Sequence, residues 1–147
     1  VLKSFIPQSI WLEFSNFQYS RISIWKSGLN MAFNNPIFGS GAGSFQQIYI
    51  QETGFWKGHS HNLPLELIIS YGIPAALLII IPILIIVFLS TKKIILNINK
   101  VSIFDKSWVT CLIVLLTSQM YDVQYFDGRI SIVLWILVSG STNIIKE

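Results

Sequence analysis

The two histidines of the chain, His59 and His61, are separated by one residue and stand at the start of a long apolar segment. A histidine just before a helix N-terminus and beside a membrane has its cationic form disfavoured, which makes His61 a candidate general base near neutral pH. The following residues also suit a purely structural helix start. Asn62 is a favoured N-cap, Pro64 fits the first turn, and Glu66 complements the positive end of the helix dipole. The spacing alone leaves the catalytic and the structural interpretation open.

A metal site at this His-x-His pair would need further ligands. Within residues 1–62 the only carboxylates are Glu13 and Glu52, and this segment has neither aspartate nor cysteine. Zinc and magnesium sites combine several such side chains. The sequence therefore predicts no metal at the histidines, and no cofactor is expected.

Three alternating glycines, Gly39, Gly41 and Gly43, follow Pro36 in a segment that could suggest a phosphate-binding loop. The dinucleotide-binding fingerprint has a different glycine spacing and follows a buried strand, whereas no strand is predicted before these residues. A tight structural turn is the favoured interpretation.

Charged residues outside the histidine pair leave two questions open. Arg21 is either a solvated side chain on a helix surface or a group that holds a diphosphate through paired hydrogen bonds. Asp122, Asp127 and Arg129 are interpreted as a polar turn at the membrane interface. The alternative is that this cluster lines the same site as His61.

The composition indicates a membrane protein. Of the 147 residues, 52% are hydrophobic and only 12% are charged, about half the charged fraction of a soluble domain. The formal net charge of +3 is modest, and no nucleic-acid partner is expected. The single cysteine, Cys111, cannot form an internal disulfide. No signal sequence follows Val1, so we expect that an upstream part of the protein is missing.

Hydropathy divides the chain into four segments. Residues 63–90 are predicted to form a transmembrane helix, because the uncharged run from Leu67 to Leu89 would span ~34 Å of a hydrocarbon core ~30 Å thick. The lysine-rich segment 91–107 predicts a cytoplasmic loop, which places residues 1–62 outside as an extracytoplasmic, periplasmic loop with amphipathic helices. Residues 108–147 are predicted as two short transmembrane helices joined by a polar extracytoplasmic turn. A re-entrant hairpin over 108–138 is the alternative.

Two helices are predicted within the extracytoplasmic loop. Apolar residues at helical spacing predict an amphipathic helix over Arg21–Phe33, which ends near Pro36 because the residue before a proline avoids the helical region. A second, short helix is predicted over Phe45–Ile50. The expected fold is an all-α membrane protein, the C-terminal part of a polytopic helical bundle with a helical periplasmic loop.

The order and spacing of these motifs resemble the O-antigen ligase and O-antigen polymerase superfamily of bacterial membrane glycosyltransferases. The motifs that carry the resemblance are Arg21-x-x-Ile24-Trp25, Asn35-Pro36-x-x-Gly39-x-Gly41-x-Gly43-x-Phe45, His61-Asn62-x-x-Leu65-Glu66 and Gly72. The resemblance covers residues 21–90, and residues 118–135 are similar to the closing pair of spans more weakly. The ligase signature usually ends in Gly, Thr or Tyr where this chain has Ala75.

This resemblance implies a C-type glycosyltransferase fold in the bacterial plasma (inner) membrane, with a multi-pass chain and a site that faces the periplasm. The donor would be a saccharide on undecaprenyl diphosphate. The acceptor would be a sugar hydroxyl of a lipid-linked core in a ligase, or of the growing glycan in a polymerase. A second arginine of the family lies upstream, so the fragment alone is expected to be inactive.

The resemblance also implies functions for individual residues. His61 would remove the proton from the acceptor hydroxyl in an inverting, metal-independent transfer, and Arg21 would hold the diphosphate. His59, Asn62 and Glu66 are the other candidate substrate-binding residues. The alternatives are a membrane transporter of the bicarbonate type and a non-catalytic envelope scaffold. A transporter would place ionisable groups in mid-membrane, and the uncharged run 67–89 has none.

Overall fold

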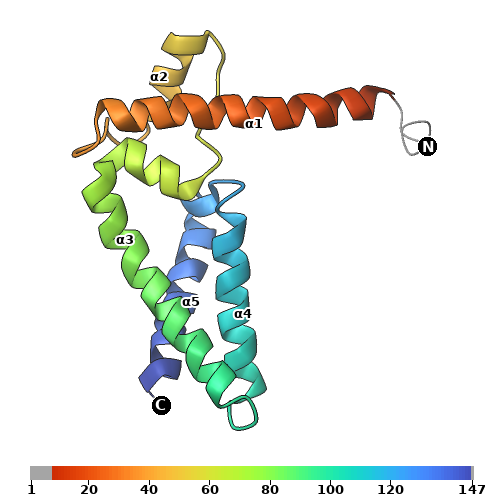
Figure 1. The fold of residues 1–147 in the computed structure, drawn as a ribbon, viewed down its shortest axis with the longest axis vertical. Helices are drawn as coiled ribbons and strands as arrows, with labels where there is room; N and C mark the ends of the chain where they lie inside the picture. Colours follow the sequence, from red (N-terminus) through yellow and green to blue (C-terminus); the bar gives the residue numbers. More distant parts are fainter. Residues whose placement is uncertain (1–7, 147) are drawn as a thin grey trace.

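The computed structural model of the chain describes residues 8–146, with side chains from Arg21 onward, and the described residues are helical without any strand. Helix α1 (Gln8–Asn34) lies across one end of the molecule, and the short helix α2 (Ser44–Thr53) packs beside it (Figure 1). Helix α3 (Leu63–Leu96) descends from there. The fold therefore has a helical cap over one end of a bundle.

Helix α1 begins earlier than the sequence predicted. The predicted helix started at Arg21, but no glycine or proline occurs between Gln8 and Ser20 to interrupt a helix. Its end at Asn34 is confirmed, directly before the Asn35-Pro36 pair. The short second helix is also confirmed, with a few more residues than predicted.

A first core cluster joins the cap to the top of α3. Its buried members come from all three helices: Ile24, Met31, Ala32, Phe45, Tyr49, Leu65 and Ile69. The Phe45 and Tyr49 rings stack with their centroids 5.3 Å apart. This apolar contact fixes α1 across the N-terminal end of α3.

Helix α3 is broken at Gly72, where φ is 83° and ψ is 167°. The glycine-rich loop crosses this break and pairs the backbone groups that the break exposes. Its amides at Ser40 and Gly41 donate to the carbonyls of Ile69 and Ser70 at 2.7 and 3.0 Å. The Ile73 amide in turn donates to the Pro36 carbonyl at 2.7 Å.

The close approach of these two backbones requires glycine on both sides. A Cβ atom on Gly39 would lie 2.6 Å from the Ser70 carbonyl carbon, and one on Gly72 would lie 2.1 Å from the Ile37 oxygen. Both glycines also have a positive φ, which disfavours any side chain. The backbone of the loop thus packs directly against the break in α3 and forms hydrogen bonds with it. The helix continues through Pro74 and Pro82 below it.

The segment 91–107, predicted as a basic loop on the cytoplasmic side, is helical at both ends. Helix α3 continues to Leu96 and includes Lys92 and Lys93, whose charges are favourable near the negative end of a helix dipole. Helix α4 (Ile103–Ser118) begins early because the Ser102 hydroxyl accepts a hydrogen bond from the Asp105 amide at 3.1 Å.

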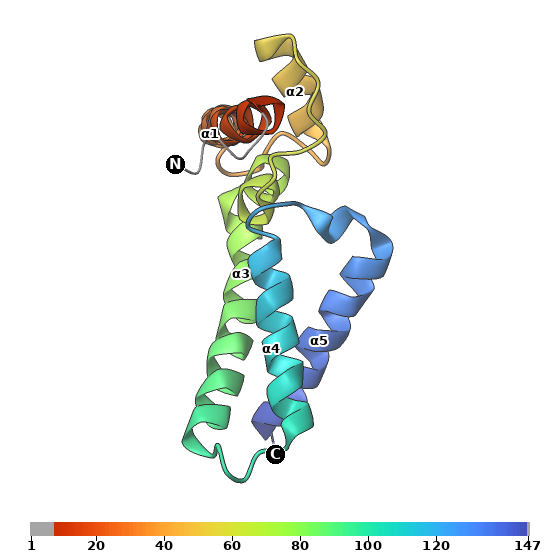
Figure 2. The same ribbon diagram turned by 90° about the vertical axis from the view of Figure 1, so that its right-hand side faces the viewer.

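The lower part of the molecule is a three-helix bundle of α3, α4 and α5 (Gly128–Lys146), in which α5 approaches α4 at the lower end and leans away from it at the upper end (Figure 2). The predicted polar turn between α4 and α5 contains the short 3₁₀ helix η2 (Gln124–Phe126). A second buried cluster of Leu112, Leu134 and Val138 holds α4 against α5, with apolar residues of α3 packed on it.

Among the described residues, two helices, α3 and α5, are long and apolar enough to cross a membrane. The apolar window of α3 has a mean hydropathy of 3.0 and is only 11% buried within the chain, which is what a lipid-facing helix requires. Helix α4 has 16 residues and would span only ~24 Å, less than a hydrocarbon core. Two short transmembrane helices were predicted after residue 108. Of the two helices found there, α5 is long and apolar enough to cross a membrane, and α4 is too short.

Candidate functional site

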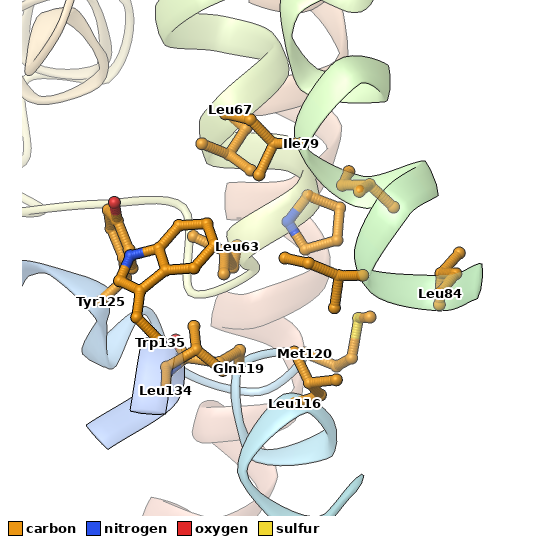
Figure 3. A pocket seen from close by; sticks show the side chains of 13 residues that line it. Leu63, Leu67, Ile79, Leu84, Leu116, Gln119, Met120, Tyr125, Leu134 and Trp135 are labelled. Carbon is orange, nitrogen blue, oxygen red and sulfur yellow. The ribbon is translucent and has the colours of Figure 1, made fainter. Parts of the chain in front are cut away.

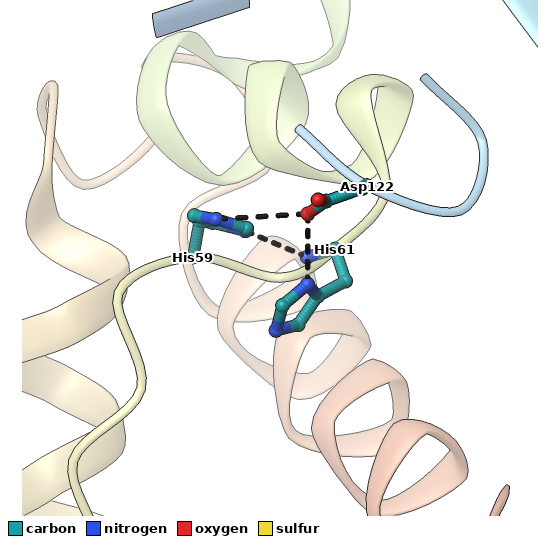
Figure 4. Close-up of side chains that lie close together, drawn as sticks. All are labelled: His59, His61 and Asp122. Carbon is teal, nitrogen blue, oxygen red and sulfur yellow. Dashed lines mark hydrogen bonds and ion pairs between the residues drawn. The ribbon is translucent and has the colours of Figure 1, made fainter. Parts of the chain in front are cut away.

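Two histidines and an aspartate meet at the N-terminal end of α3 (Figure 4). His61 Nδ1 lies 3.0 Å from Asp122 Oδ1, and His59 Nε2 lies 3.8 Å from the same oxygen. The two imidazole rings pack edge to face with centroids 4.4 Å apart. Each histidine side chain is 27% exposed and Asp122 is 48% exposed, so solvent or substrate can reach the group.

This geometry selects one tautomer of His61. An ionised carboxylate only accepts hydrogen bonds, so the 3.0 Å contact requires the His61 proton on Nδ1. The lone pair of Nε2 then remains available to accept a proton. An aspartate that holds the far nitrogen of a histidine is a recurring way to orient a general base.

The backbone around His61 is held in an unusual conformation. Its φ of 55° is the only positive φ of a non-glycine residue in the described part of the chain. The amide of the buried Ser60 donates to Glu66 Oε2 at 2.8 Å, and its hydroxyl donates to the Asn62 carbonyl at 3.1 Å. Residues held in such sparsely populated regions cluster at functional sites.

Asn62 joins the two halves of the site. Its side-chain oxygen accepts from the Leu65 amide at 3.0 Å, as expected for an N-cap, while its amide nitrogen donates to the Met120 carbonyl at 3.2 Å. The Leu63 amide donates to the Gln119 carbonyl at 2.9 Å. The start of α3 is therefore tied to the end of α4, directly before Asp122.

Arg21 reaches the same end of the bundle from α1. Its Nη1 donates to the carbonyl of Tyr121, the residue before Asp122, at 2.6 Å. The structure thus brings together all five candidate residues of the sequence analysis: Arg21, His59, His61, Asn62 and Glu66. Glu66 is buried and accepts a hydrogen bond from the Ser60 amide, so it contacts the backbone of the site.

The polar cluster after α4 is divided by the fold. Asp122 faces the histidines, whereas Asp127 and Arg129 form an ion pair with each other at 3.1 Å. The sequence left open whether this cluster lines the site of His61, and only Asp122 does so. In the sequence, Asp122 could be recognised as a carboxylate that closely follows an apolar helix. In the structure this position lies at the end of the bundle where α3 begins.

Charge and burial shift two pKa values in this site. Burial lowers the pKa of His59, the neighbouring His61 lowers it further, and the carboxylates of Asp122 and Glu66 offset only part of this. Partial burial by itself raises the pKa of Asp122. The hydrogen bond from His61, the charges of both histidines and the Val123 amide outweigh it, and the net pKa of Asp122 lies below its ordinary value. Asp122 is therefore ionised near neutral pH.

A third possible metal ligand comes from outside the first loop. Residues 1–62 offer only Glu13 and Glu52 as carboxylates, but Asp122 joins His59 and His61 in a group in which one ligand atom from each of three side chains lies within 4.8 Å of the others. The fold, rather than the local sequence, supplies this third side chain.

An apolar cavity of about 110 Å³ lies next to the polar group, between α3, α4 and α5 (Figure 3). Leu63 and Pro64, at the start of α3, line it together with Gln119 and Met120, at the end of α4. Aromatic side chains of Tyr125 and Trp135 complete it. A polar site and an apolar slot are thus adjacent, an arrangement suited to an amphipathic ligand.

These features define the class of the protein: an all-helical protein of membrane type, with a histidine–aspartate pair at one end of its bundle. Residues 12–80 match the family model described as O-antigen ligase, which supports membership of the chain in the O-antigen ligase family. Neither the curated proteins nor the solved structures gave a significant match. The matched segment includes Arg21, the glycine loop and His61, and Asp122 lies beyond it.

The match to the O-antigen ligase model points to a ligase-like or polymerase-like enzyme in polysaccharide assembly. It also implies lipid-linked glycan substrates, in agreement with the apolar helices of the chain.

Proposed function

We propose that the chain carries the catalytic end of a membrane enzyme that transfers a saccharide from undecaprenyl diphosphate to a sugar hydroxyl of a lipid-linked or glycan acceptor. The observation that carries this proposal is the contact of His61 Nδ1 with Asp122 Oδ1, which leaves Nε2 as a base. His61 takes the acceptor proton as the hydroxyl oxygen attacks the anomeric carbon, and the bond to the diphosphate breaks with inversion.

The leaving diphosphate needs charge stabilisation rather than a strong acid, because it is already a good leaving group. In this proposal Arg21 provides it through a planar guanidinium that can bind two phosphate oxygens at once. The contact of Arg21 with the Tyr121 carbonyl keeps it beside the histidine pair. No metal takes part in this mechanism.

The apolar cavity suits the start of the isoprenoid chain of the donor. It borders Leu63 and Met120, which are next to Asn62 and Tyr121 of the polar site. In this proposal a lipid diphosphate with its chain in this slot directs its head group toward Arg21 and His61. In the same proposal His59 and Asn62 contribute to binding the sugars.

The proposed orientation in the membrane is based on the positions of the lysines. Lys92, Lys93, Lys100 and Lys106 lie on or beside the loop that joins α3 to α4, at the end of the bundle opposite the histidines (Figure 1). Such a cluster favours the cytoplasmic side. In the proposed topology of the bacterial inner membrane, the site faces the periplasm.

The proposal is tested with the full-length protein that contains this chain, in its native membrane or in reconstituted vesicles. Glycan transfer from an undecaprenyl-diphosphate donor to a sugar acceptor is followed by the mobility or mass of the product. Transfer that requires the chain supports the proposal. If the chain moves a solute across the vesicle, or supports assembly with no transfer of its own, the transporter or scaffold alternative replaces it.

For Arg21, we expect substitution by alanine to lower transfer by about 10²-fold, as for the loss of one donor to a developing anion. Lysine should restore only a minor part, because it lacks the planar fork. Lys26→Ala, an exposed cation on the same helix, is the matched control and should retain transfer. Near-normal activity of Arg21→Lys would show that the transfer does not depend on bidentate binding of the diphosphate by Arg21.

A further inference from the structure

We propose that His59, His61 and Asp122 form a binding site for a zinc-type divalent cation, and that a cation bound there inhibits the enzyme by occupying its base. The three side chains present two imidazole nitrogens and a carboxylate oxygen toward one point (Figure 4). Two histidines and one carboxylate with an open fourth position are a common ligand set for zinc. The inhibitory part of this inference rests on the function proposed above, in which His61 is the base.

The distances agree with tetrahedral coordination. Zinc–nitrogen and zinc–oxygen bonds of about 2.0–2.1 Å place tetrahedral ligands about 3.3 Å apart. Asp122 Oδ1 lies 3.0 Å from His61 Nδ1 and 3.8 Å from His59 Nε2, so the two separations bracket that value. All three ligand atoms lie within 4.8 Å of one another, so side-chain rotations would be needed to bring them around one ion.

The charge around the group also favours a cation. Asp122 contributes one carboxyl group to the cluster, and the buried carboxyl group of Glu66 lies on the adjacent turn, where it contacts the Ser60 amide. Arg21 is the positive side chain whose contact reaches this loop, through Tyr121. The partial exposure of the two histidines leaves a path for the ion from solvent.

Binding of the cation would move one proton within each imidazole ring from one nitrogen to the other. Each ring would remain neutral. A cation on His61 Nδ1 displaces the proton that Asp122 holds there, and the neutral ring then carries its proton on Nε2. The Nε2 lone pair is thereby lost, so the base cannot act. His59 binds through Nε2 and moves its proton to Nδ1, which ends its 3.3 Å hydrogen bond from the His61 amide.

The test is a zinc titration of the full chain in lipid nanodiscs, read by competition with a fluorescent chelator. All proteins carry Cys111→Ser, because this exposed thiol is the one cysteine of the chain. We expect one saturable site, with cobalt giving the visible absorption of a tetrahedral complex. His59→Gln and Asp122→Asn should each weaken binding by about 100-fold, at least as much as the loss of an outer partner of a metal ligand.

Asp127→Asn is the matched control, since Asp127 lies on the same turn but pairs with Arg129. It should bind zinc as the parent protein does. Absence of saturable binding in the parent protein overturns the proposal, as does equal binding by the parent, His59→Gln and Asp122→Asn. This readout needs no catalysis, so its outcome is independent of the proposed transfer. Zinc that binds but does not slow an active preparation overturns the inhibitory part.

Discussion

Replacing His61 by asparagine is expected to lower the turnover of glycan transfer by about 10²- to 10⁴-fold, the usual contribution of a positioned general base. Asparagine is the informative choice because it tolerates the positive φ of 55° at this position. The backbone strain is then kept, and the loss reports on chemistry rather than on folding. The Nδ1–Asp122 contact and the Nε2 lone pair both disappear.

The measurement is initial transfer rate against acceptor concentration, with equal amounts of folded protein in vesicles. We expect the loss in kcat, with a smaller change in KM. Asp127→Asn, a carboxylate on the same turn that pairs with Arg129, is the control and should keep its rate. Transfer by His61→Asn at the parent rate would show that another group takes the proton.

The second large effect is on stability, through Gly72. Alanine at this position is expected to lower the free energy of unfolding by about 3 kcal/mol or more, because two costs combine. The backbone there, at φ 83° and ψ 167°, is accessible almost only to glycine. The added Cβ would also lie 2.1 Å from the Ile37 oxygen, which would force the glycine loop away from the break in α3.

Gly41→Ala is the control for this experiment. Gly41 also has a positive φ, of 100°, but a Cβ there would meet nothing within 4 Å. It should therefore show only the backbone cost, about 1–3 kcal/mol. Unfolding in mixed micelles, followed by tryptophan fluorescence, compares the two. Equal stability of both variants would mean that contact between the loop and the kink contributes nothing.

Local sequence predicted the start of α3 well, because the helix signals there are short-range. Asn62, Pro64 and the apolar run act within a few residues, and the structure has the N-cap bond expected of Asn62. The end of α1 before Pro36 was predictable for the same reason. The earlier start of α1 was not predicted. A helix can continue through residues whose hydrophobic periodicity is weak, provided that no glycine or proline interrupts it.

The partner of His61 could not be predicted from local pattern. Asp122 is 61 positions away, and its approach depends on α4 returning along α3 and on hydrogen bonds from Asn62 and Leu63 to the end of α4. Such a tertiary contact leaves no periodic trace in a single sequence. The break at Gly72 was hidden in a similar way, because it exists only where the glycine loop supplies the missing hydrogen bonds.

In the proposed transfer, Asp122 acts through His61 and not by itself. The most direct measurement is the transfer rate of four proteins: the parent, Asp122→Asn, His61→Asn and the double variant. We predict that Asp122→Asn lowers the rate by about 10- to 100-fold when His61 is present, as for other outer partners of a functional histidine. In the His61→Asn background the same change should have no further effect. An equal loss in both backgrounds, or no loss in either, would contradict the account.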